Sequence, residues 1–178
     1  MPHIPAGAER RDEENSGRFM DAIINMLREE RATKGLKSLS VVAVHEDFAT
    51  GARVGEVCRT LAGELGGGCE VVNQPWLVNL LRLPRLRAIA AEDAAAADVV
   101  IVSLHDAGEF PIELKDWVEA WLQQKRDHPK VLLALFDEDG GQTAGLLQAY
   151  LEAAAQRGGL AFFLQPYEPA ASPGYLRG

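Results

Sequence analysis

The chain alternates short apolar runs with longer segments in which apolar residues recur at helical spacing. The apolar runs are rich in β-branched residues, as expected of strands that are buried on both faces of a sheet. They cover residues 39–44, 70–73, 98–103, 130–136 and 160–164. Helical spacing falls between them, at 52–65, 84–97, 111–124 and 143–157. This rhythm predicts an α/β protein with a three-layer, doubly wound, five-stranded parallel sheet, and it favours the strand order 2-1-3-4-5.

A further helix is expected ahead of the sheet, over residues 17–32. Its apolar residues form a one-sided stripe: Phe19, Met20, Ile23, Ile24, Met26 and Leu27. The stripe is suited either to packing on the chain's own domain or to a homodimer or partner contact. The expected organisation is a flexible tail at 1–14, this helix within 15–35, the sheet domain at 36–166 and an irregular tail at 167–178.

Composition narrows the range of partners. The chain has 18 Lys and Arg against 26 Asp and Glu, a net charge of −8, which disfavours nucleic acid and anionic membranes because both attract basic surfaces. The N-terminus lacks the apolar segment of a signal peptide, and no run approaches the roughly 20 apolar residues of a membrane span, so we expect a cytoplasmic protein. Cys58 and Cys69 lack metal-ligand spacing, and reduced thiols are the simplest account.

Four loop segments are expected to meet at one edge of the sheet, because the carboxyl ends of parallel strands lie together. They are residues 45–53, 74–77, 104–111 and 137–143. Ligands of doubly wound sheets bind outside this edge, near the place where strands 1 and 3 lie side by side. The sequence therefore predicts a small-molecule site among these four segments.

One of these segments lies within a stretch that resembles a known family. Residues 97–117 read ADVVIVSLHDAGEFPIELKDW. The stretch resembles the flavodoxin-like NAD(P)H-dependent FMN reductases, in which Ala-Asp introduces a strand that ends in Ser or Thr, and a glycine loop, a proline and Leu-Lys-Asn/Asp follow. The matching residues are Ala97, Asp98, Ser103, Gly108, Pro111, Leu114, Lys115 and Asp116. The resemblance covers about 30 residues and implies an FMN-binding redox protein that takes electrons from NAD(P)H or a partner.

The resemblance also implies where a flavin would lie. The flavin ring would be held by the loop after strand 3, whose candidate residues are Ser103, His105, Asp106, Gly108 and Phe110. Trp76 is a further candidate for contact with the ring. Asp106 stands where the family has a tyrosine, and Leu104 where it has a proline.

The family holds the FMN phosphate in a loop of the form Thr/Ser-x-Thr-Gly-x-Thr, which presents backbone N–H groups and hydroxyls at a helix N-terminus. Thr50 and Gly51 match this loop, whereas Phe48 and Arg53 replace two of its hydroxyl residues. Arg53 is suited to pair with a phosphate, or equally to form an ion pair on the helix surface.

The same edge is rich in acids, and this supports a different function. The acids are Glu46, Asp47, Asp106, Glu109, Asp137, Glu138 and Asp139. They would repel a phosphate, and Glu46, Asp47 and Asp106 form an alternative Mg²⁺ site. Glu46-Asp47 also resembles the acidic pair of response-regulator receivers, but the phosphoacceptor position falls on Ser103, which cannot form an acyl phosphate. His45 and His105 are a weaker candidate pair for a transition metal.

Two functions of different classes therefore remain open from the sequence. The first is an FMN-binding oxidoreductase resembling the NAD(P)H-dependent flavin reductases. The second is a cofactor-free, flavodoxin-like or receiver-like domain for signalling or protein interaction, with an acidic edge.

Overall fold

The computed structural model describes residues 20–30, 32, 37–66, 68–105, 111–124, 131–137 and 141–167. The tail expected at 1–14 lies outside these residues, as does the tail expected at 167–178 apart from residue 167. The helix expected over 17–32 is present at residues 20–30 and at residue 32.

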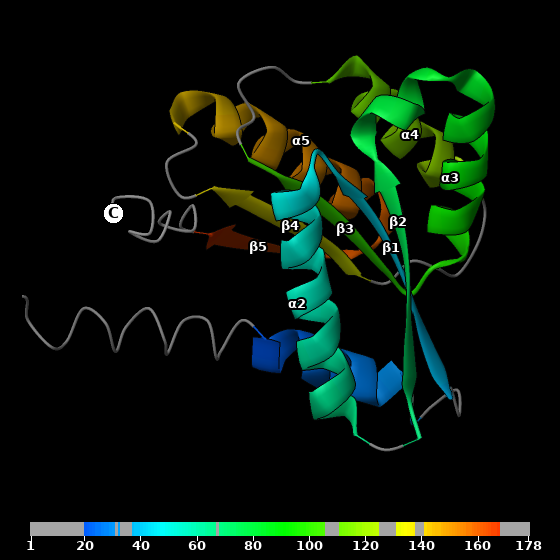
Figure 1. The fold of residues 1–178 in the computed structure, drawn as a ribbon, viewed down its shortest axis with the longest axis vertical. Coiled ribbons are helices and arrows are strands. Elements are labelled where there is room, and N and C mark those ends of the chain that lie inside the picture. The colour runs from blue at the N-terminus through cyan, green and yellow to red at the C-terminus, as the bar shows by residue number, and fades with distance from the viewer. Residues whose placement is uncertain are drawn as a thin grey trace, which may run out of the picture.

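The core of the fold is a five-stranded sheet in which every neighbouring pair of strands is parallel (Figure 1). The strands are β1 (Ser38–His45), β2 (Glu70–Leu77), β3 (Val99–Leu104), β4 (Val131–Asp137) and β5 (Ala161–Tyr167). Their order is β2-β1-β3-β4-β5, which confirms the predicted order 2-1-3-4-5. β3 has six residues and all of them are buried, as its continuous β-branched sequence requires of the central strand.

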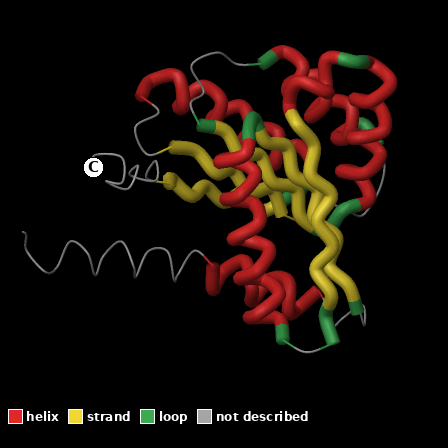
Figure 2. Tube along the Cα trace, viewed as in Figure 1, coloured by secondary structure: helices red, strands yellow, loops and turns green. Residues whose placement is uncertain are grey.

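Helices cover both faces of the sheet (Figure 2). They are α2 (Phe48–Leu65), the 3₁₀ helix η1 (Val78–Arg82), α3 (Pro84–Ala96), α4 (Ile112–Leu122) and α5 (Gly141–Gly158). Buried residues of α3, α4 and α5 form one apolar cluster with one face of the sheet. α2 and the helix at 20–30 form a second cluster with the opposite face. Within the described part of the chain, no helix is long and apolar enough to span a membrane.

The apolar stripe of the N-terminal helix packs on the chain's own domain. Ile23, Ile24 and Leu27 are buried in the same cluster as residues of β1 and α2. Arg28 Nη2 donates to the carbonyl oxygen of Glu64 at 2.7 Å, which fastens the helix to the end of α2. These three residues of the stripe are thus covered within the chain, whereas Phe19 lies outside the described residues.

Three sequence expectations are wrong in detail. Residues 74–77 are the last part of β2 and not a loop, because an edge strand tolerates both polar residues and Pro75, which has no N–H to donate. α2 begins at Phe48, four residues before the expected start, because a side-chain cap initiates it there. The helical spacing over residues 143–157 predicts that Leu146 faces inward, but Leu146 is 69% exposed on α5.

Candidate functional site

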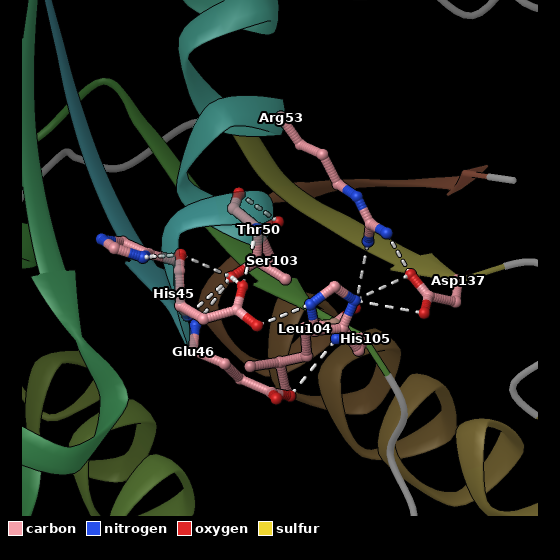
Figure 3. A network of polar contacts seen from close by, with 9 residues as sticks. His45, Glu46, Thr50, Arg53, Ser103, Leu104, His105 and Asp137 are labelled. Atoms are coloured by element: carbon pink, nitrogen blue, oxygen red, sulfur yellow. Dashed lines mark hydrogen bonds and ion pairs between the residues drawn. The ribbon is translucent and has the colours of Figure 1, made fainter. Parts of the chain in front are cut away.

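The carboxyl ends of β1, β3 and β4 meet the N-terminus of α2 and form the candidate site (Figure 3). Its charged residues are connected by hydrogen bonds and ion pairs, and we call them the polar network: Glu46, Asp47, Arg53, His105 and Asp137. They come from three places in the sequence that only the sheet order brings together. The polar network therefore lies at the edge where the sequence predicts a small-molecule site.

His105 lies at the centre of the polar network. Its Nε2 is 2.7 Å from Asp47 Oδ2, and its Nδ1 is 3.2 Å from Asp137 Oδ2. Both contacts are hydrogen bonds at the same time only when both ring nitrogens carry a proton. The backbone N–H of His105 also donates to Glu46 Oε1 at 3.3 Å. The imidazole is thus held between two carboxylates from opposite sides of the edge.

Arg53 is buried, which corrects the expectation that it makes its ion pair on the helix surface. It is only 8% exposed, and its guanidinium pairs with the carboxylate of Asp137. Its Nη1 also donates to the carbonyl oxygen of Leu104 at 3.4 Å. A charge buried at this depth needs a partner because desolvation is costly. Arg53 is therefore directed at a carboxylate of its own chain.

Asp47 occupies the N-terminus of α2, where the resemblance would place a phosphate. Its Oδ1 accepts from the backbone N–H of Thr50 at 2.9 Å, as the N-cap of the helix. Burial raises the pKa of Asp47, but hydrogen bonds from Thr50 and His105 outweigh it, so the pKa lies below its usual value. An ionised carboxylate of the chain itself thus fills this anion position.

The hydroxyl of Thr50 completes the same cap. Its Oγ1 accepts from the backbone N–H of Glu46 at 2.9 Å and from that of Asp47 at 3.0 Å. The two residues form a reciprocal capping box, and Thr50 is fully buried. The hydroxyl that matched the phosphate loop is therefore used within the chain.

Close packing against His45 explains why residue 51 is a glycine. A Cβ at this residue would lie 3.0 Å from Nδ1 of His45, whose ring packs against the helix. The same nitrogen is 2.9 Å from the carbonyl oxygen of Asp47. In Figure 3 the ring of His45 points away from His105, so the two histidines do not converge on one ligand position. The Thr-Gly pair is thus explained by the helix cap and by His45.

Two further residues of the edge have structural contacts. Ser103 is buried, and its Oγ donates to the carbonyl oxygen of Thr50 at 2.9 Å, which fastens β3 to α2. Burial raises the pKa of Glu46, although the His105 N–H lowers it in part.

Of the residues that the sequence suggested for cofactor binding, the structure brings together five, namely Thr50, Gly51, Arg53, Ser103 and His105. Trp76 is not among them, because it lies within β2, opposite Val44, and packs against the apolar cluster on the α3 side. Asp106, Gly108 and Phe110 lie outside the described residues.

Sequence reasoning missed the roles of Asp47 and Asp137. The spacing of Asp47 and Thr50 is that of a helix cap, and this signal was available. Asp137 was named among the acids of the edge, but no local signal identifies its two partners, because one follows β3 and the other lies on α2. Among the residues that the structure describes, no three His, Cys, Asp or Glu side chains are placed to hold a metal ion.

Comparison with known proteins gives only distant similarities. No protein-family model matches the chain, and no curated protein matches its sequence. A short-chain flavodoxin associated with a bacterial microcompartment is 17% identical, with a TM-score of 0.49 over 75% of this chain and 86% of that one. The Trp repressor binding protein from Bacillus subtilis is 14% identical, with a TM-score of 0.48 over 78% and 91%. The strand order by itself identifies the fold as flavodoxin-like.

Proposed function

We propose that this chain is a cofactor-free, flavodoxin-like domain that binds other proteins in signalling or assembly. The observation that supports a domain without FMN is the N-terminus of α2, which is capped by Asp47 and closed by the Thr50 hydroxyl. A phosphate dianion and the Asp47 carboxylate would compete for the same backbone N–H group.

The charges at the carboxyl edge of the sheet also disfavour a bound FMN phosphate. A phosphate charge about 4 Å from an ionised carboxylate is repelled by about 4 kcal/mol at an effective dielectric constant of about 20. Arg53 would offset this repulsion only if it left Asp137, whose carboxylate would then lose its buried partner. The described residues of the phosphate loop therefore do not fit an FMN phosphate.

The alternative is the FMN-binding redox protein that the resemblance at 97–117 implies, an NAD(P)H-dependent FMN oxidoreductase if it is an enzyme. One observation favours it: Ser103 lies near the end of β3 and His105 directly follows this strand, at the edge where this fold binds ligands. The flavin ring would then have to be held without the phosphate loop of the flavodoxins.

Absorbance and thermal unfolding of the purified protein distinguish the two functions. We expect a colourless protein whose Tm is unchanged by 1 mM FMN, or by riboflavin as the control without a phosphate. A ligand at 100 times its Kd adds about 2.7 kcal/mol, which is about 5–10 °C for a domain of this size. Flavin absorbance near one equivalent, or such a rise in Tm with FMN, would overturn the proposal.

A variant of the cap tests the physical reason. Asp47→Ser keeps a capping oxygen but removes the negative charge from the anion position. If the Asp47 carboxylate is what excludes phosphate, inorganic phosphate stabilises this variant more than the wild type. Equal responses of the two proteins to phosphate would contradict the role assigned to Asp47.

A further inference from the structure

β5 is an edge strand of the sheet, and one side of its backbone faces away from β4 (Figure 1). The backbone N–H of Val131 donates towards β3, to the carbonyl oxygen of Asp98 at 3.4 Å, so the next residue, Leu132, bonds to β5. Leu132 is the register partner of Phe162. Of two register partners in a parallel ladder, only one bonds to the other strand. Phe162 and, two residues later, Leu164 therefore direct their N–H and C=O groups outward.

β5 is also an apolar and uncharged strand. Residues 160–167 contain no Asp, Glu, Lys or Arg. Phe162 and Leu164 are partly buried against one face of the sheet, and Phe163 is partly buried against the other. Within the described part of the chain, no hydrogen bond is made to the outward groups of Phe162 or Leu164. An edge strand of this kind is a template for pairing with another strand, unless charges or a proline interrupt it.

The opposite edge strand, β2, is protected against such pairing. The N–H of Glu70 donates to the carbonyl oxygen of Lys37 at 3.0 Å, so Glu70 bonds to the β1 side and every second residue from Val71 onward faces outward. Pro75 therefore lies in the outward row, where it has no N–H to offer to a second strand. In β5 the proline is Pro166, which follows the outward N–H groups. β5 is thus the edge that is suited to pairing.

We infer that β5 pairs antiparallel with β5 of a second copy of this chain, about a two-fold axis that passes beside Phe163. The N–H of Phe162 then donates to the carbonyl oxygen of Leu164 in the second copy, and the N–H of Leu164 donates to that of Phe162. The two five-stranded sheets become one continuous sheet. The inference goes beyond the proposed function and does not depend on it, because β5 contributes no residue to the polar network.

The groups of β5 match one another in this pairing, which is why a second copy is the occupant that we infer. Every outward N–H finds a carbonyl oxygen, and Pro166 lies opposite Leu160, outside the strand, where its missing N–H removes no bond. Phe162 lies opposite Leu164 on one face, and Phe163 lies opposite Phe163 on the other, an aromatic pair of the kind that stabilises antiparallel strands. A charged segment of another protein would meet no opposite charge along β5.

The net charge of the chain opposes this dimer, but only through solvent. Each copy carries a net charge of −8, yet no charged residue lies on the paired strands. Salt screens repulsion between charges that solvent separates, because the Debye length falls from about 30 Å at 10 mM to about 10 Å at 0.1 M. The dimer should therefore tighten as salt is raised, whereas an interface made by ion pairs would weaken.

Sedimentation velocity of the full chain tests the dimer at concentrations from about 1 to about 500 µM, which cover weak specific complexes. We expect a monomer–dimer equilibrium whose Kd falls at least threefold between about 20 and about 200 mM NaCl. A chain that stays monomeric throughout, or a dimer that salt dissociates, would overturn the inference. FMN binding is measured separately, so the two proposals can fail independently.

Cysteines placed across the junction test the register. Residue 161 of one copy lies opposite residue 165 of the other in a non-hydrogen-bonded pair, with Cα atoms about 4.5 Å apart, which suits a disulfide. Within one copy the same two residues are about 13 Å apart and cannot bond. Oxidised Ala161→Cys/Gln165→Cys should therefore be a covalent dimer. Each single variant, which keeps the native Cys58 and Cys69, is a matched control. No crosslink in the double variant, or an equal crosslink in a single one, would overturn the pairing.

A charge on the edge strand tests which strand is used. Leu164→Lys should weaken the dimer at least tenfold, because a charged side chain on an edge disfavours pairing with a second strand. Val72→Lys is the matched control, since Val72 is an exposed aliphatic residue of the other edge strand, and it should dimerise as the wild type does. Thermal unfolding checks that both variants are folded. A dimer that survives Leu164→Lys, or equal weakening by Val72→Lys, would overturn β5 as the interface.

Discussion

Replacement of Asp137 by Asn tests whether the polar network holds the carboxyl edge together. Asp137 pairs with the buried guanidinium of Arg53 and with Nδ1 of His105. Asn keeps one acceptor oxygen and the size of the side chain but removes the charge. Arg53 would then be a largely buried cation without this carboxylate, so we expect Asp137→Asn to destabilise the fold.

The expected loss of stability follows from the burial of the Arg53–Asp137 ion pair. Breaking a buried ion pair by removing one partner costs about 3–5 kcal/mol. The side chains of Arg53 and Asp137 are 10% and 17% exposed, and Asn preserves one hydrogen bond, so about 2 kcal/mol is the expected loss here. For a domain of this size that loss corresponds to a decrease in Tm of about 4–8 °C.

Thermal and urea unfolding of four proteins measure this loss. They are the wild type, Asp137→Asn, Arg53→Gln and the double variant. Because each single change removes the oppositely charged partner of the other residue, the loss in the double variant should be clearly smaller than the sum of the two single losses. Additive losses, or a decrease below 1 °C for Asp137→Asn, would refute the reasoning.

Three further predictions concern the cap and the ionisable groups. Thr50→Val should lower stability by about 1–2 kcal/mol in urea unfolding, because two backbone N–H groups lose their acceptor, whereas Thr50→Ser should retain most of it. The pKa of Glu46 is raised in the folded state, so its ionisation costs stability as pH rises above 4.5 through the folded pKa. Glu46→Gln should therefore raise Tm at pH 8 relative to the wild type more than at pH 4. Hydrogen bonds from Arg157 and Tyr150 lower the pKa of Glu119 to about 2, so its stabilising effect is present above pH 4.5 and is lost as pH falls towards 2. Glu119→Gln should lower Tm by about 2–4 °C at pH 7, where an exposed pair contributes up to about 1 kcal/mol, and by little at pH 2; an equal decrease at both pH values would contradict this.

The strands and helices could be predicted from the sequence because their signals are local. A continuous β-branched run such as residues 99–102 is stable only as a strand that is covered on both faces. In α4 the apolar residues recur at helical spacing, and the structure buries Leu114, Trp117, Val118 and Trp121 as that spacing requires. Alternation of such strands and helices then allows few arrangements, and right-handed crossovers make 2-1-3-4-5 a natural order.

The predicted ends of the strands and helices were less accurate where solvent exposure alters the pattern of apolar residues. β2 extends through Trp76 and Leu77, because an edge strand is hydrogen-bonded on one side only and needs no continuous apolar sequence. α2 begins at Phe48, because the carboxylate of Asp47 replaces hydrogen bonds that the first turn lacks.

The chemistry of the site depended on contacts between residues far apart in the sequence. Arg53 and Asp137 are 84 residues apart, and His105 is 58 residues from Asp47. Periodicity carries no information about such pairs, whereas the sheet order places the ends of β1, β3 and β4 side by side. The sequence by itself determined a flavodoxin-like frame with acids at its carboxyl edge. Only the tertiary structure decided that these acids hold the chain's own imidazole and guanidinium, because those partners become neighbours only when the sheet assembles.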